Sequence, residues 1–140
     1  MKMLVAVDGS DGAAKAVAHV VRIAPFVIGL EVQLVTVCAP LDTWEVGRFM
    51  TREDVMGWQR ESAEAAFSPA RTLLDAGGVP YTTHILTGPV AERIVEEAAN
   101  QGCDSIVIGT RGLGPLAGLL VGSVAGKVIA LSDVPVTLVR

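Results

Sequence analysis

The sequence predicts a single α/β domain: an open, parallel five-stranded sheet in the order 3-2-1-4-5 with helices on both faces. Short apolar runs alternate with segments of helical period along the whole chain, an alternation typical of parallel sheets with crossover helices. Gly, Pro, Asp and Ser stand at the junctions between these segments. A length of 140 residues is that of one domain, so we expect residues 1–140 to form one folded unit.

The five predicted strands are short, mostly apolar and bounded by turn residues. They run from Met3 to Val7, Glu31 to Cys38, Val79 to Leu86, Asp104 to Gly109 and Val134 to Val139. The predicted helices run from Ser10 or Asp11 to Ile23, Arg52 to Ala76, Pro89 to Gly102 and Ser123 to Leu131. The stretch 39–50 has no clear period and is expected to be a loop.

Pro69 lies inside the second of these predicted helices. A proline in a helix interior removes a backbone donor and usually kinks the helix. We therefore expect a disturbance there, and a clear end at Gly77-Gly78.

The polarity of the strands predicts their order. The first and fourth strands are almost purely apolar, as expected for central strands covered on both faces. The third is more polar and the fifth carries Pro135, so both are expected at edges. The order 3-2-1-4-5 follows, and it places a switch point between strands one and four, where ligands of such sheets bind. The loops after these strands, beginning at Asp8 and Gly109, should therefore meet.

Charge and composition exclude some classes of function. Fifteen acidic against eleven basic residues give a net charge of −4, which argues against a nucleic-acid partner. The first apolar run is too short for a secretory signal or a membrane span. Cys38 and Cys103 are expected to be buried thiols, and a cytoplasmic protein is predicted.

The stretch from Gly109 to Ala125 has glycine at five of its seventeen positions. It connects a predicted strand to a predicted helix. Such a connection favours a phosphate, because backbone amides and the helix dipole both attract an anion. Glycine leaves room for close backbone approach.

The glycine spacing resembles a known signature. Gly109, Gly112, Gly122 and Ser123 follow the pattern G-x2-G-x9-G-S of the universal stress protein family, in its ATP-binding branch. VAVDGS at 5–10 and SDVPVTLVR at 132–140 are similar to that family's first and last strands. The resemblance covers residues 1–140 and implies a Rossmann-like fold of the adenine nucleotide α-hydrolase type.

The resemblance implies a nucleotide site. Asp8 would bind the ribose hydroxyls, the backbone of Val37 would contact adenine, and Gly109 would pack against the ribose. Backbone amides and one hydroxyl would bind the phosphates, from Gly112, Gly122, Ser123 and Val124. Arg111 would pair with phosphate or cover the base. Because this loop offers few cations, ATP is expected to bind with Mg²⁺ or Mn²⁺.

Simpler interpretations remain for several of these residues. Asp8 could cap the helix that follows it, Ser123 could be only an N-cap, and Arg111 could be a solvated cation. Lys127 is expected to be a surface lysine. Ala125 stands where the family usually has a second hydroxyl, and Gly126 costs roughly 1 kcal/mol inside a helix relative to alanine.

The predicted function is that of an ATP-binding, nucleotide-dependent regulator of a stress response. No catalytic residue and no metal-ligating side chain is assigned, so at most slow ATP hydrolysis is expected. The alternatives are a nucleotide-independent dimeric interaction module and a slow ATPase. The apolar strand from Val134 to Val139 is expected at an edge, which predicts a homodimer through it. No nucleic acid or membrane partner is expected.

Overall fold

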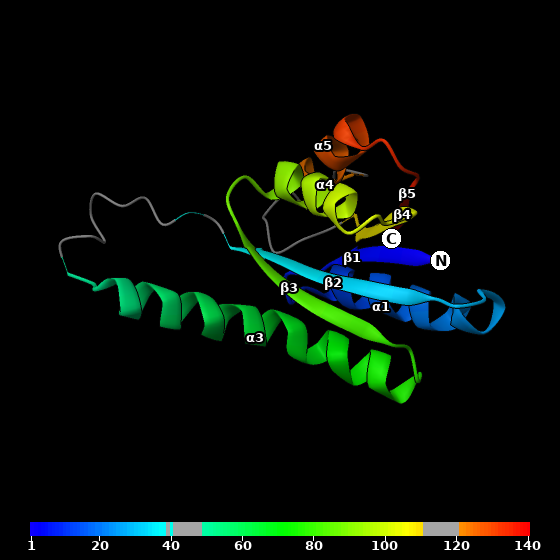
Figure 1. The fold of residues 1–140 in the computed structure, drawn as a ribbon, viewed down its shortest axis with the longest axis horizontal. Coiled ribbons are helices and arrows are strands. Elements are labelled where there is room, and N and C mark those ends of the chain that lie inside the picture. The colour runs from blue at the N-terminus through cyan, green and yellow to red at the C-terminus, as the bar shows by residue number, and fades with distance from the viewer. Residues whose placement is uncertain (39, 41–48, 111–120) are drawn as a thin grey trace.

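A computed structural model describes residues 1–38, 40, 49–110 and 121–140 of the chain. These residues form a five-stranded parallel sheet flanked by four α-helices (Figure 1). The strands are β1 (Lys2–Ala6), β2 (Glu31–Cys38), β3 (Tyr81–Thr87), β4 (Ser105–Gly109) and β5 (Val136–Val139). The helices are α1 (Asp11–Ile23), α3 (Arg52–Ala76), α4 (Val90–Asn100) and α5 (Ser123–Leu131), with a 3-10 turn η1 at Ala24–Phe26.

The strand order is β3-β2-β1-β4-β5, which confirms the predicted order 3-2-1-4-5. β1 lies at the centre, where Val5 pairs with Leu34 of β2 on one side and with Val107 of β4 on the other. β1 and β4 are the most apolar strands and are covered on both faces, as is most of β2. The switch point therefore lies between β1 and β4.

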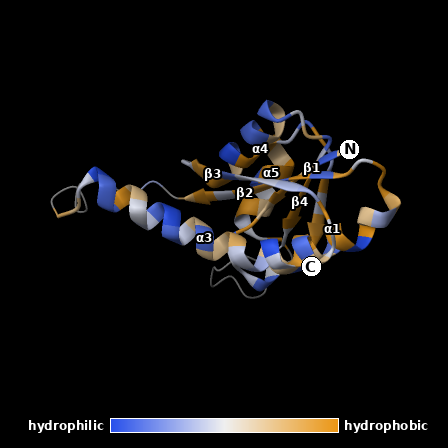
Figure 2. Ribbon diagram, turned by 60° about the horizontal axis from the view of Figure 1, so that its bottom comes forward, coloured by the Kyte–Doolittle hydropathy of each residue, from blue (hydrophilic) through white to orange (hydrophobic). Residues whose placement is uncertain are grey.

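The two faces of the sheet build two separate cores. Met3, Val5 and Val7 pack into the core under α1 and α3, whereas Leu4 and Ala6 pack into the core under α4 and α5. This alternation follows from the two-residue period of a strand. Figure 2 shows the apolar residues gathered on the sheet and on the helix sides that face it, with hydrophilic residues outside. Helices on both faces are thus confirmed.

Several element boundaries differ from those predicted. The strand expected from Val79 begins at Tyr81, because the Val79 N–H donates to the Leu74 carbonyl at 3.0 Å and so closes the end of α3. The strand expected from Val134 begins at Val136. The turn η1 was not predicted from the sequence, although Pro25 at its start is a typical signal. Most of the loop expected at 39–50 lies outside the described residues.

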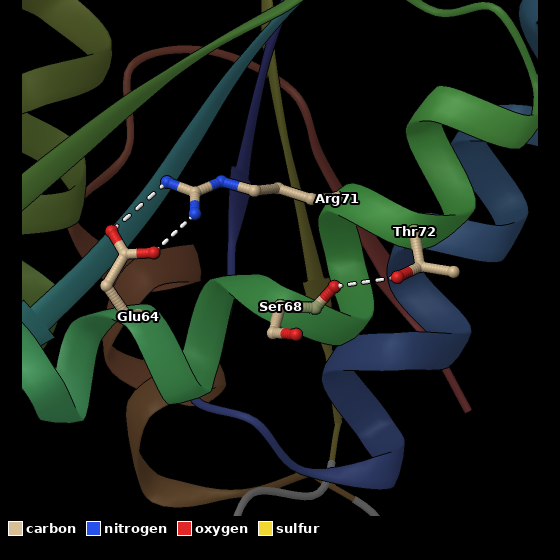
Figure 3. A network of polar contacts seen from close by, with 4 residues as sticks. All are labelled: Glu64, Ser68, Arg71 and Thr72. Atoms are coloured by element: carbon tan, nitrogen blue, oxygen red, sulfur yellow. Dashed lines mark hydrogen bonds and ion pairs between the residues drawn. The ribbon is translucent and has the colours of Figure 1, made fainter.

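α3 continues through Pro69 as one helix. Around the proline, the Thr72 hydroxyl donates to the Ser68 carbonyl at 3.1 Å, and the Arg71 guanidinium pairs with Glu64 at 2.5 Å (Figure 3). Arg71 and Glu64 are two turns apart, so their contact spans the turn that contains Pro69. Proline therefore does not end this helix.

α3 extends well past the sheet at its N-terminal end (Figure 1). It begins at Thr51 with a capping box shared with Asp54. No residue of 52–62 is buried, and Ala63 is the first that is. The N-terminal part of α3 is therefore held mainly by its own helical bonds and its cap.

Candidate functional site

The turn after β1 is fixed by its own side chains. Asp8 accepts a hydrogen bond from the Ser10 N–H on Oδ1 at 2.9 Å, and Gly9 has φ of 83°, which favours glycine. The cap of α1 is Ser10, whose Oγ accepts from the Ala13 N–H at 3.2 Å. The simpler interpretation of Asp8 as the helix cap is therefore wrong. Its carboxylate is exposed at the carboxyl edge of the sheet.

Gly109, the last residue of β4, lies against the first turn of α1. A Cβ placed on Gly109 would lie 2.5 Å from both the carbonyl carbon and the oxygen of Gly12. Only glycine allows this approach of two backbones. The loop after β1 and the end of β4 therefore meet, as the switch point predicts.

The start of α5 is the third part of this edge. Gly122 is the N-cap, and its own N–H donates to the Thr110 carbonyl at 2.9 Å. The simpler interpretation of Ser123 as an N-cap is wrong, because Ser123 is the first residue inside the helix. Ser123 and Val124 are exposed, and helical geometry gives their N–H groups no acceptor within the helix. The end of α5 that points to this edge can therefore offer amides to an anion.

Thr110 connects this helix start to the edge of the sheet, and the sequence did not single it out. It is 4 % exposed. Its N–H donates to the Val139 carbonyl at 2.9 Å, and its carbonyl accepts from Gly122. A Cβ on Gly122 would lie 2.9 Å from the same carbonyl oxygen. A polar residue directly after a buried strand was the available signal.

Val37 lies near the carboxyl end of β2 and is half buried. It comes two residues after Val35, whose carbonyl accepts from the Val7 N–H at 2.8 Å, so it lies beyond the end of β1 on the Asp8 side. Its neighbour Cys38 directs its thiol to the Gln59 carbonyl of α3 at 3.8 Å. Burial raises the pKa of this thiol, which keeps it neutral at physiological pH.

Arg111 and Gly112 lie outside the described residues. Lys127, one turn after Ser123, pairs with Glu92 of α4, and both side chains are exposed. The hydrogen bond from Lys127 holds the pKa of Glu92 below its usual value. Ala125 is 2 % exposed and packs in the core under α4 and α5. A side chain at Gly126 would meet nothing closer than a Val121 methyl at 4.0 Å.

The described groups at this edge are backbone amides and a few polar side chains. In the described part of the chain no group of three or more His, Cys, Asp or Glu is arranged to hold a metal ion. None of the helices in that same part is long and apolar enough to cross a membrane. The exposed Asp8 carboxylate and the exposed residues Ser123 and Val124 belong to chain segments that each follow a strand at this edge.

Comparison with known proteins agrees with this architecture. The model of the universal stress protein family matches residues 1–140. A universal stress protein of Thermus aquaticus is 35% identical over 139 residues, which are 99% of this chain and 97% of that protein.

Two solved structures share the fold. The structure of the hypothetical protein MJ0577 has a TM-score of 0.82 and 29% identity, over 99% of this chain and 94% of that one. A universal stress protein from Archaeoglobus fulgidus, in complex with dAMP, has a TM-score of 0.72 and 26% identity, over 100% and 98%. The family model spans the whole sequence, and these relatives cover nearly all of it. The chain therefore belongs to the universal stress protein family.

Proposed function

We propose that this protein binds ATP at the carboxyl edge of the sheet and acts as a nucleotide-dependent regulator of a stress response. The observation that carries the proposal is the meeting of the Asp8 turn, Gly109 and the start of α5 at the switch point. The dAMP complex of the Archaeoglobus protein supports an adenine nucleotide as the ligand.

The proposed roles are those that the resemblance to the family implies. The Asp8 carboxylate accepts hydrogen bonds from the ribose hydroxyls, because a carboxylate repels phosphate and suits a hydroxyl donor. The backbone of Val37 contacts adenine, and Gly109 lies under the ribose. The amides of Gly112, Ser123 and Val124, with the Ser123 hydroxyl, bind the phosphates together with the backbone at Gly122. Arg111 pairs with a phosphate or covers the base.

The described cation near the start of α5, Lys127, is already paired with Glu92. A triphosphate therefore needs further neutralisation, and we propose that it binds with Mg²⁺ or Mn²⁺. Phosphate oxygens are ligands that Mg²⁺ accepts readily, so the ion needs few ligands from the protein. The exposed Asp8 carboxylate is the described group suited to contact it or its water shell.

Thermal unfolding with and without Mg·ATP tests this proposal. A ligand at 100 times its dissociation constant stabilises the folded state by about 2.7 kcal/mol. Asp8→Asn should reduce that shift, whereas Asp11→Asn, an equal change of charge in the first turn of α1, should leave it unchanged. No shift of the wild-type chain at millimolar Mg·ATP would overturn ATP binding. Rapid, saturable phosphate release that depends on Asp8 would favour the ATPase alternative.

We also propose that the protein is a homodimer that pairs through β5. β5 is an edge strand, and its residues Val136, Leu138 and Val139 are only partly buried. Bare apolar edges are usually covered. Ile129 and Leu131 of α5 add exposed apolar surface nearby. Both described cysteines are free thiols, in keeping with the cytoplasmic location that we propose.

Light scattering tests the dimer. We expect twice the chain mass of 14.6 kDa at micromolar concentration. Thr137→Lys places a charge on the exposed side of β5 and should yield monomers, whereas Thr82→Lys makes the same change on the opposite edge strand β3 and should not. A monomeric wild type would refute the pairing. A dimer that binds no nucleotide would favour the interaction module.

A further inference from the structure

The ion pair between Glu92 and Lys127 joins the first turn of α4 to the second turn of α5. Glu92 lies in the first turn of α4, and Lys127 is the fifth residue of α5. The pair connects helices that pack side by side in the same core. Both helices begin at the carboxyl edge of the sheet, because each follows a strand of a parallel sheet. The pair therefore stands beside the proposed phosphate site.

Lys127 lies on the same side of α5 as Ser123. The two residues are four positions apart, which places them one above the other on the helix surface. Helical side chains lean toward the N-terminus, so the Lys127 ammonium extends toward the end that carries Ser123. A terminal phosphate held at that end would lie within reach of this flexible cation. In the structure, the cation is instead engaged by Glu92.

We propose that Glu92 sets the preference among adenine nucleotides by their number of phosphates. Its carboxylate occupies the Lys127 ammonium and adds a negative charge beside the helix start, so it weakens the binding of ATP more than that of AMP. This inference rests on the proposed function, that adenine nucleotides bind at this edge. The lowered pKa of Glu92 keeps its carboxylate charged throughout the neutral range.

The charges of the ligands make the selectivity measurable. ATP carries roughly two more negative charges than AMP, since each of its two additional phosphates adds about one charge at neutral pH. The interaction energy of two unit charges a few ångströms apart at a water-exposed surface is about 1 kcal/mol. A change of one protein charge should therefore alter ATP affinity about five-fold and AMP affinity less than two-fold.

Titration calorimetry with ATP and with AMP, without divalent cations and at low ionic strength, tests the inference on the whole chain. Glu92→Gln should raise ATP affinity about five-fold, and Lys127→Met should lower it about five-fold. The double variant should return the ratio of the two affinities close to that of the wild type. Adding Mg²⁺, which neutralises much of the extra charge of ATP, should reduce the effect of Glu92→Gln.

Glu96→Gln is the matched control. It removes the same charge from the same helix, one turn further from the sheet edge, and its partner is Arg93. It should leave the ratio unchanged. If Glu92→Gln leaves the ratio unchanged, or Glu96→Gln changes it equally, the inference is overturned while nucleotide binding stands. If the wild-type chain binds neither nucleotide, the proposed function fails, and the inference fails with it.

Discussion

Replacing Gly109 by alanine should destabilise the fold through a clash of two backbones. The added Cβ would lie 2.5 Å from the carbonyl carbon and oxygen of Gly12, whereas ordinary contact begins at 3.4 Å. The first turn of α1 or the end of β4 must move by about 0.9 Å to relieve this overlap. Neither is a side chain that can rotate away.

The expected cost lies at the upper end of overpacking, about 3 kcal/mol, because the clash is with backbone and not with a movable side chain. With a urea m-value of about 2 kcal/mol/M, the midpoint of unfolding should fall by about 1.5 M. Equilibrium urea unfolding followed by circular dichroism measures it.

Gly126→Ala is the control for Gly109→Ala. Its Cβ meets only a Val121 methyl at 4.0 Å, and it lies inside α5. It should stabilise the protein by about 1 kcal/mol, the cost of glycine in a helix. A Gly109→Ala variant that unfolds at or above the wild-type urea concentration, with the same m-value, would refute the argument from backbone contact.

Three further substitutions address α3 and its ends. Gly57→Ala should stabilise the protein by about 1 kcal/mol in thermal unfolding, because its Cβ would point into open space on a helix; a loss of stability would contradict this. Pro69→Ala should stabilise the protein by about 2 kcal/mol in urea unfolding. A proline in a helix interior costs about 3 kcal/mol, and about 1 kcal/mol of that is offset because proline lowers the entropy of the unfolded chain. An unchanged midpoint would show that the surrounding contacts already offset the missing N–H. Asp54→Asn should flatten the pH dependence of stability on the acid side. Hydrogen bonds from Thr51 lower the Asp54 pKa below 3.8, so the stabilisation is present above that pH and is lost as pH falls through the lowered pKa. An acid unfolding curve that matches the wild type would contradict it.

The strand order could be predicted because the fraction of apolar residues in each strand reflects how far that strand is covered in the sheet. Runs such as Ser105–Gly109, with almost no polar residue, fit a position covered on both faces, and Pro135 fits an edge. The meeting of the two loops followed from that order. The strand starts were less predictable, since Val79 is apolar enough for a strand but closes a helix.

The glycine spacing predicts a phosphate loop, but it does not give the structural reason for each glycine. A side chain at Gly109 would clash with the backbone of Gly12, and one at Gly122 would clash with the carbonyl of Thr110. The first contact joins residues far apart along the chain, and the second joins the two ends of a loop. Ala125 stands where the family usually has a second hydroxyl, and here it is buried in the core under α4 and α5. The spacing of a motif does not show whether a residue packs against the protein or faces a ligand.

His84 and the helix that covers it form a polar cluster that the sequence could not predict. His84 Nε2 lies 2.7 Å from Gln33 Oε1, and its Nδ1 lies 3.3 Å from Glu97 Oε1. Glu97 is buried on α4 and also accepts from Gln101 Nε2 at 2.8 Å. From the sequence alone, a glutamate on a helix is expected to face solvent. Its burial is explained only by the polar partners that β2 and β3 supply. Predicting this cluster would require the relative positions of β2, β3 and α4.

The length of α3 beyond the sheet has a consequence for hydrogen exchange. Residues 52–62 can open without exposing any buried side chain, whereas opening around Phe67 and Ala70 would break the core. One continuous helix should thus contain amides that exchange through local fraying and amides that exchange only in sub-global unfolding. The boundary between the two exchange regimes should fall near Ala63, the first buried residue of the helix.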